Sequence, residues 1–142
     1  MSADKSERPE RRRAPAALRL QQIVPSLTVG DIEASLAWYR DILGFHIREK
    51  WEHDGKVMGA SLVAGTAHLM LGQDDWAKGR DRAKGEGFRL YLNMSRSVDE
   101  LAAGIESRGG TLDAQPEDMP WGARIFSIVD PDGFKITFST AT

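Results

Sequence analysis

The chain has 142 residues, of which 41% are hydrophobic and 28% charged, and its formal net charge is −2. This length suits one domain or two small fused modules, and the near-neutral charge gives no electrostatic reason to expect nucleic acid or membrane as a partner. The absence of cysteine excludes disulfides and thiolate metal sites and fits a cytoplasmic location. No apolar run approaches the roughly 20 residues that span a bilayer, and no signal peptide is recognisable.

Residues 1–17 are predicted to form a disordered tail. They are rich in charge and contain Pro9, Pro15 and the run Arg11–Arg13. Such a composition cannot bury enough apolar surface to order itself. The arginine run could contact nucleic acid or acidic lipid, but a solvated tail is the favoured interpretation. Residues 18–142 are predicted to form one domain made of two modules, at about 20–72 and 87–140.

The first module is predicted to contain a strand, a helix and three more strands. Asp31 is a suitable N-cap, and Gly44 suits the left-handed position that ends a helix. Between them an apolar stripe recurs at helical spacing, formed by Ile32, Leu36, Tyr39 and Leu43. The strands are expected at residues 20–29, 45–51, 57–64 and 67–71.

Residues 72–87 break this pattern, because they are charged and glycine-rich and contain one large aromatic residue, Trp76. They are interpreted as a linker or flap. The element order then repeats in the second module, where Ser97 and Glu100 form a capping box at the start of the helix. Its strands are expected at residues 88–94, 111–114, 123–129 and 134–139, the last two joined by the turn Asp130-Pro131-Asp132-Gly133. The chain is therefore predicted to be an α+β protein with two tandem βαβββ modules.

Each helix is expected to cover one face of a curved mixed or antiparallel sheet, so that the opposite faces enclose a cavity. Because successive side chains of a strand point to opposite faces, alternation sorts the residues between core and cavity. Leu27, Val29, Leu69, Leu71, Leu90 and Leu92 are assigned to the helix side. Val24, Ser26, Thr28, His68, Met70, Arg89, Tyr91, Asn93 and Thr137 are assigned to the cavity side.

Two segments carry a resemblance to a known family: VPSLTVGDIEASLAWYRDILGF at residues 24–45 and PWGARIFSIVDPDGFKITF at residues 120–138. Together they resemble the vicinal oxygen chelate superfamily, which contains glyoxalase I, fosfomycin resistance enzymes, extradiol dioxygenases and bleomycin resistance proteins. The resemblance covers about residues 20–139. It implies the paired βαβββ fold around a cavity, which the pattern of residues also predicts.

The resemblance further implies up to four metal ligands, His or Glu and sometimes Gln, on the first and fourth strands of each module. Carried onto this sequence, the positions are Val24, Met70, Arg89 (or Phe88 if the register shifts by one) and Thr137. None of these side chains offers an imidazole or a carboxylate, which are the donors that such divalent metals require. We therefore expect no metal and no other cofactor, as in the bleomycin-resistance-like branch of the family.

Several polar and aromatic residues remain as candidates for ligand binding. His68 could be a metal ligand if the register is shifted, a general base, or a polar residue in the wall of the cavity. Arg89, Tyr91 and Asn93 could orient an anionic or carbonyl-bearing ligand, although Arg89 could instead pair with a carboxylate across the sheet. Trp76 and Trp121 could form aromatic walls or simply cover the core.

The leading hypothesis is that a homodimer binds or sequesters a small molecule, such as an antibiotic or metabolite, without a metal. The ligand contacts would come from the cavity residues and the two tryptophans named above. The alternative is a metal-dependent, glyoxalase-like lyase, isomerase or transferase. In that case His68 is the first candidate for a metal ligand. No catalytic residue is assigned, so whether this chain is an enzyme stays open.

Overall fold

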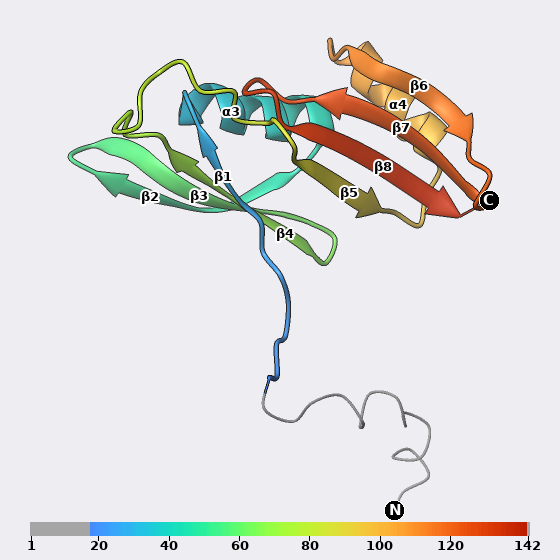
Figure 1. The fold of residues 1–142 in the computed structure, drawn as a ribbon, viewed down its shortest axis with the longest axis horizontal. Helices are drawn as coiled ribbons and strands as arrows, with labels where there is room; N and C mark the ends of the chain where they lie inside the picture. The colour runs from blue at the N-terminus through green and yellow to red at the C-terminus, as the bar shows by residue number, and fades with distance from the viewer. Residues whose placement is uncertain (1–17, 142) are drawn as a thin grey trace, which may run out of the picture.

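The structure is a computed structural model that describes residues 18–141; the predicted tail, residues 1–17, lies outside the described residues. Two modules with the same element order follow each other, as predicted (Figure 1). The first contains β1 (Ser26–Val29), α3 (Ile32–Trp38), η1 (Tyr39–Leu43), β2 (His46–His53), β3 (Lys56–Ala64) and β4 (Ala67–Gln73). The second contains β5 (Arg89–Asn93), α4 (Val98–Ser107), β6 (Leu112–Asp118), β7 (Ala123–Val129) and β8 (Lys135–Ala141).

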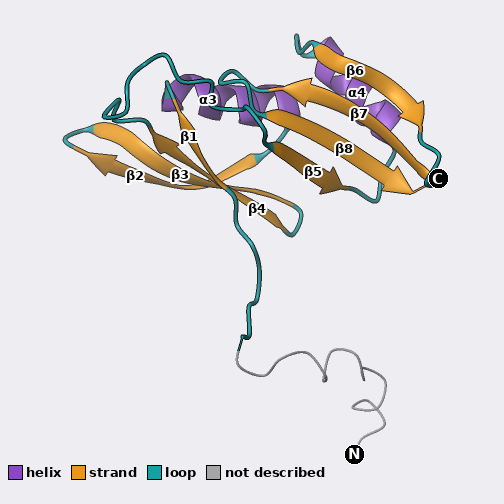
Figure 2. Ribbon diagram, viewed as in Figure 1, coloured by secondary structure: helices purple, strands orange, loops and turns teal. Residues whose placement is uncertain are grey.

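Each module forms one four-stranded mixed sheet, with the helix of that module against one face (Figure 2). Sheet A has the strand order β1-β4-β3-β2, and sheet B repeats it as β5-β8-β7-β6. The first strand of each module is parallel to the last one, and the other neighbours are antiparallel. The second face of each sheet, opposite its helix, is called the open face below. This architecture confirms the predicted α+β fold with two tandem modules.

The first helix begins where the sequence predicts but ends differently. The side chain of Asp31 caps it by accepting a hydrogen bond from the backbone N–H of Ala34 at 3.2 Å. The α-helix then gives way to a π-helical turn at Tyr39–Leu43, which the sequence pattern did not indicate. Gly44 ends the turn with a φ of 97°, the left-handed conformation that was expected of it.

The core lies between the helices and the sheet faces that they cover. The predicted helical stripe, Ile32, Leu36, Tyr39 and Leu43, is buried throughout. Strand alternation also holds on the helix side of both sheets, where Leu27, Val29, Leu69, Leu71 and Leu90 are buried. Leu92 is partly buried against this core. The alternation therefore identifies the open faces correctly as well, since they carry the intervening residues.

Two strands differ from their predicted bounds. The first begins at Ser26 rather than near residue 20, because Pro25 lacks the N–H that would continue the ladder, and residues 18–25 leave the body as an extended arm (Figure 1). The short strand expected at residues 111–114 is instead β6, Leu112–Asp118. Its Pro116 is tolerated because β6 is the edge strand of sheet B and its register with β7 is shifted there.

The two sheets share no strand pairing within the described residues, so other contacts join the modules. At one end of the first helix, the backbone N–H of Gly30 donates to Oδ1 of Asp132 at 2.8 Å. At the other end, the guanidinium of Arg108 donates twice to the carbonyl of Ile42, at 3.1 and 2.8 Å. The first helix is thus held against the second module at both ends.

The linker after β4 contains no helix or strand from residue 74 to residue 88, as predicted, but it is well anchored. The side chain of Asp74 is only 4% exposed and forms ion pairs with Lys84 and, at 3.4 Å, with Arg82. The Lys84 hydrogen bond is the main reason why the pKa of Asp74 falls to about 2. Among the described residues, no helix has the length and apolar character needed to cross a membrane.

Candidate functional site

The open face of sheet B gathers polar side chains from three neighbouring strands. The register places Arg89 beside Lys135, Tyr91 beside Thr137, and Asn93 beside Ser139, each pair joining β5 to β8. On the other side of β8, β7 adds one residue to each row: Val129, Ser127 and Ile125. Three of the residues predicted on strand 88–94 therefore share a face with Thr137, as alternation requires.

A chain of hydrogen bonds crosses the middle of this face. Nη1 of Arg89 donates to Oγ1 of Thr137 at 2.9 Å, and Thr137 shares a second hydrogen bond with the hydroxyl of Ser127, also 2.9 Å long. Thr137 is fully buried, while Arg89 is exposed. One end of the Arg89 guanidinium is thus held by the neutral, buried hydroxyl groups of Thr137 and Ser127. The carboxylate partner that the sequence analysis considered for Arg89 is absent from the described residues.

Tyr91 and Asn93 extend the face away from Arg89. The phenol of Tyr91 donates to Oγ of Ser139 at 3.0 Å, and the Tyr91 residue is 46% exposed. Asn93 is exposed at the end of the same strand. Small side chains thus form the floor of this face, and larger polar side chains stand above it and could orient a bound molecule.

A hollow lies at the Arg89 end of the face and has a volume of about 490 Å³. Arg89 and Lys135 supply positive charge to it, Phe88 and Val129 supply apolar surface, and Asp113 supplies the single carboxylate. Three glycines complete the lining: Gly85, Gly87 and Gly133. Because the Lys135 ammonium lies 3.2 Å from Oδ2 of Asp113, Arg89 is the cation of this hollow without an ion pair in the described chain.

The remaining predicted residues of the first module lie on sheet A. Met70 and His68 are half-buried on β4, and the register partner of Met70 on β1 is Ser26. Val24, two residues earlier, lies in the segment that precedes β1 and is also half-buried. His68 lines a small space at the junction of the modules, together with Pro25 and Leu90. The small space at His68 and the hollow at Arg89 have separate linings, and neither of them includes Thr137.

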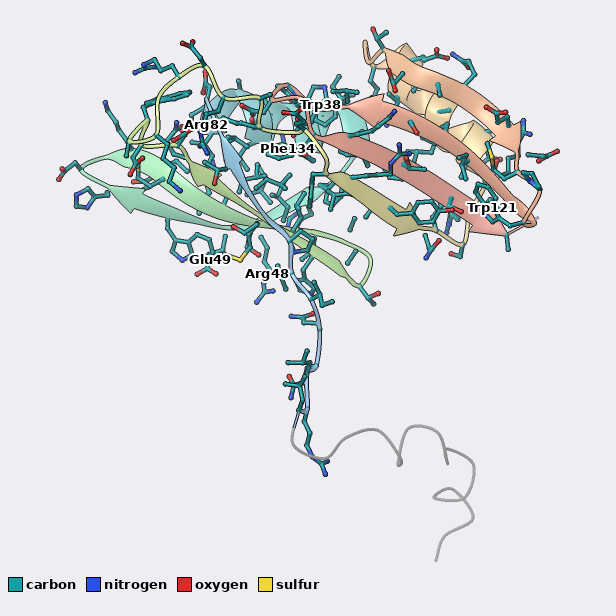
Figure 3. All side chains as sticks on the ribbon, in the orientation of Figure 1. Trp38, Arg48, Glu49, Arg82, Trp121 and Phe134 are labelled. Atoms are coloured by element: carbon teal, nitrogen blue, oxygen red, sulfur yellow. The ribbon has the colours of Figure 1, made fainter. Side chains whose placement is uncertain are left out.

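The two candidate tryptophans lie in different places. Trp76 belongs to the linker, where the guanidinium of Arg80 lies 4.4 Å from the centre of its ring and the ammonium of Lys84 lies 5.2 Å from it. Trp121 is 65% exposed in the turn between β6 and β7. Figure 3 shows it at the far end of sheet B, well away from Arg82 of the linker. Within one chain, therefore, the two rings do not line the same hollow.

The donor set does not fit the divalent metal that the resemblance implies. Of the four positions, Val24 has no donor atom, Met70 offers a thioether, and Thr137 offers a hydroxyl that is already hydrogen-bonded. Arg89 places a permanent positive charge 2.9 Å from that hydroxyl. In the described part of the chain, no group of three or more His, Cys, Asp and Glu side chains could hold a metal ion.

Sequence reasoning missed two parts of this site. Ser127 was not singled out, although it alternates with the buried Phe126 and Ile128 and the rule applied to the other strands would have placed it on the open face. The contribution of Gly85 and Gly87 to the hollow had no periodic signal, because these residues belong to an irregular loop.

Comparison with known proteins gives one family. A family model described as "Glyoxalase/Bleomycin resistance protein/Dioxygenase superfamily" matches residues 19–138. A protein from Synechocystis sp. named "Probable lactoylglutathione lyase" is 28% identical over 117 residues, which cover 78% of this chain and 87% of that protein.

Solved structures share the fold. A member of the same superfamily from Sphaerobacter thermophilus is 28% identical, with a TM-score of 0.68, over 87% of this chain and 99% of that one. TnmS3, an antibiotic binding protein from Streptomyces sp., is 23% identical, also with a TM-score of 0.68, over 88% of this chain and 99% of that one. At that level of identity, the second likeness establishes the fold alone.

Proposed function

Because this chain belongs to the glyoxalase/bleomycin resistance protein/dioxygenase superfamily, we propose that it binds a small organic molecule on the open face of sheet B without a metal ion. The ligand would be an antibiotic or a metabolite, held non-covalently. The observation that carries this proposal is the hydrogen bond from Arg89 to Thr137. It supports the proposal because the resemblance aligns these two residues with positions where metal-dependent relatives use carboxylate or imidazole donors.

The chemistry of the face supports binding rather than metal-assisted catalysis. Tyr91 and Asn93 present exposed polar groups, and the adjoining hollow of about 490 Å³ falls within the size range of small-molecule sites. The structural neighbour TnmS3 is named as an antibiotic binding protein, which makes antibiotics a reasonable first class of ligand to test. A cytoplasmic location remains a prediction from the absence of cysteine.

We also propose that two copies assemble into a homodimer. Away from the hollow and from Tyr91, a single chain exposes large apolar side chains that a partner could cover, among them Trp51, Met58 and Trp121. Exposed apolar groups of this kind often mark association surfaces. A second sheet placed over the open face of sheet B would also convert an open surface into an enclosed cavity.

The alternative is a metal-dependent, glyoxalase-like lyase, isomerase or transferase. It is favoured by the 28% identity to the Synechocystis protein named as a probable lactoylglutathione lyase. It is disfavoured by the donor set, because none of the four implied positions carries a carboxylate or an imidazole.

Two measurements distinguish the hypotheses. Antibiotics and aromatic metabolites are titrated while tryptophan fluorescence is recorded, and Tyr91→Ala is expected to weaken the best binder at least about tenfold, because it removes an exposed aromatic contact. Glu33→Gln, an exposed change on α3, is the matched control. The metal content of chain incubated with Ni²⁺, Zn²⁺ or Mn²⁺ is then measured after gel filtration with in-line light scattering, which also reports the oligomeric state. Stoichiometric retained metal would overturn metal independence, and a monomer at micromolar concentration would overturn the dimer.

A further inference from the structure

We propose that the ligand carries an oxyanion group, such as a carboxylate, phosphate or sulfonate, and that Arg89 binds it in the hollow beside Phe88 and Val129. This inference rests on the proposed function and deepens it, since it names the chemical class of the ligand. Three features of the hollow carry it: its unbalanced charge, the fixed position of Arg89 and its apolar walls.

The charge balance of the hollow is positive. Its lining contains two cations, Arg89 and Lys135, and one carboxylate, Asp113, which leaves one positive charge in excess. Lys135 is already paired with Asp113 at 3.2 Å. No carboxylate in residues 18–141 pairs with Arg89, whose one side-chain hydrogen bond there goes to a neutral hydroxyl. The guanidinium has five N–H donors, so most of its binding capacity is left for a ligand.

The guanidinium of Arg89 is preorganised for binding. Thr137 is fully buried and is hydrogen-bonded to Ser127. Its hydroxyl, which accepts the hydrogen bond from Nη1 of Arg89, is therefore held in a fixed position. A guanidinium held in this way loses less conformational freedom when it binds a carboxylate or phosphate. The same hydroxyls leave the charge of Arg89 uncompensated, because they carry none themselves.

The walls of the hollow determine the rest of the ligand. Phe88 and Val129 are each 40% exposed, although both are large apolar residues. Phe88 is held in place by an edge-to-face contact with Phe134, with 5.7 Å between the ring centres. A Cβ at Gly87 or Gly133 would meet no atom within 4 Å, so these two glycines of the lining leave room that larger residues would fill. The hollow therefore suits an amphiphilic molecule, with a flat or apolar body against Phe88 and an oxyanion at Arg89.

A second basic hollow, of about 310 Å³, lies on the other side of Phe88, and it is a weaker candidate. Arg82 and Lys84 supply its charge, together with the hydroxyls of Ser26 and Thr28. Both cations already pair with the buried Asp74. An anion bound there would have to compete with that carboxylate, whereas an anion at Arg89 would not.

The test compares two fluorescent probes that share the same aromatic rings. The first, 1-anilinonaphthalene-8-sulfonate, carries an oxyanion, and the second, N-phenyl-1-naphthylamine, is neutral. The full chain and three variants are titrated with each probe: Arg89→Gln, Arg89→Lys and, as a matched control, Arg40→Gln. Arg40 is an exposed arginine on η1 that pairs with Asp41 and lies outside the hollow. Thermal unfolding of every variant confirms that it is folded before affinities are compared.

We expect the wild-type chain to bind the sulfonate about tenfold more tightly than the neutral probe. Arg89→Gln should lose this preference while its affinity for the neutral probe is unchanged, Arg89→Lys should keep part of it, and Arg40→Gln should keep all of it. Benzoate and phenyl phosphate are then used as competitors, and the one that displaces the sulfonate at the lower concentration identifies the preferred oxyanion.

Two results are adverse, and they can be told apart. If both probes bind equally well and Arg89→Gln changes neither affinity, or if neither competitor displaces the sulfonate, the oxyanion inference is overturned while small-molecule binding stands. If neither probe nor any molecule of the antibiotic and metabolite panel binds, the proposed function fails together with it.

Discussion

The phenol of Tyr39 donates a hydrogen bond of 2.7 Å to Oδ2 of Asp130, and both side chains are buried. These residues are 91 positions apart, one in the π-helical turn of the first module and the other in the turn before β8. Asp130 also accepts hydrogen bonds from the backbone N–H groups of Asp132 and Phe134, at 2.9 and 2.8 Å. A single carboxylate thus shapes its own turn and ties that turn to the other module.

We predict that Tyr39→Phe will lower the free energy of unfolding by about 1–3 kcal/mol at pH 7, because a buried carboxylate loses one hydrogen-bond donor. Burial raises the pKa of Asp130, and the Tyr39 hydrogen bond partly opposes that rise. A raised pKa in the folded state means that the contribution of Asp130 to stability is present at acid pH and is lost as the pH rises through that pKa. The Tyr39 hydrogen bond lowers the pKa of Asp130, so it favours the ionised carboxylate and matters less where the carboxyl is protonated. We expect the cost of Tyr39→Phe to be smaller at pH 4 than at pH 7 for this reason.

Urea unfolding at both pH values measures this effect. Tyr91→Phe is the matched control, because Tyr91 is 46% exposed and donates to a hydroxyl rather than to a carboxylate. Equal losses for the two variants, or a Tyr39→Phe cost that does not depend on pH, would contradict the role assigned to Asp130.

The stability that Asp74 gives to the linker should change with pH in the direction opposite to that of Asp130. Hydrogen bonding to Lys84 is the largest cause of the lowered pKa of Asp74, about 2 against 3.8 for a free side chain. A lowered pKa in the folded state gives stability that is present above the unfolded value and is lost as the pH falls toward about 2. We therefore expect the Trp76 indole N–H resonance to report release of the linker over that acid range.

Asp74→Asn should produce the same release at neutral pH, seen as faster tryptic cleavage within residues 78–84. Asp75→Asn is the control, since it removes an equal charge from the neighbouring, exposed residue. Identical cleavage rates for Asp74→Asn and the wild-type chain would show that the ion pairs do not hold the linker.

Gly85 should not tolerate any side chain. A Cβ built at Gly85 would lie 1.9 Å from the carbonyl oxygen of Gly133, which belongs to the backbone and cannot simply rotate away. We predict that Gly85→Ala will cost about 1–3 kcal/mol of stability and displace the end of the linker from the hollow. Gly72→Ala is the matched control, because a Cβ there meets nothing within 4 Å. Thermal unfolding of both variants tests the prediction, and a neutral Gly85→Ala would refute the close backbone approach.

Thr137→Val removes the hydroxyl of Thr137 but keeps the shape of the side chain, so it isolates the contribution of the hydroxyl to stability. It leaves the guanidinium of Arg89 and the hydroxyl of Ser127 without their shared partner, so we expect a loss of about 1–2 kcal/mol in the free energy of unfolding. Thr28→Val, an exposed change on β1, should be nearly neutral. Denaturant unfolding compares the two, and a neutral Thr137→Val would mean that the hydroxyl chain contributes little.

Local patterns were sufficient for much of the fold. The helical stripe from Ile32 to Leu43 and the alternation of Leu69 with Met70 are periodic, so one sequence reveals which side of each element is buried. The same rule placed Arg89 and Thr137 on one face. It could not show that they touch, because their hydrogen bond depends on the parallel register of β5 and β8, which joins residues 48 positions apart.

Other features have no periodic signal at all. The ion pairs of Asp74 with Lys84 and Arg82 form inside an irregular loop, where the charged and glycine-rich composition suggested only a linker or flap. The π-helical turn keeps Tyr39 and Leu43 buried just as an α-helix would, so the apolar pattern cannot distinguish the two. The distance between Trp76 and Trp121 depends on how the modules pack, which neither module determines by itself.

The lack of strand pairing between the two sheets has a consequence for how this architecture can diversify. Backbone ladders tolerate few changes of angle, but no ladder crosses from one module to the other in the described chain. Their mutual tilt instead depends on side-chain packing in the shared core and on contacts such as those of Gly30 with Asp132 and of Arg108 with Ile42. Substitutions at these contacts could therefore widen or narrow the space between the halves over evolutionary time, and so admit molecules of new sizes, while each half keeps its own folding pattern intact.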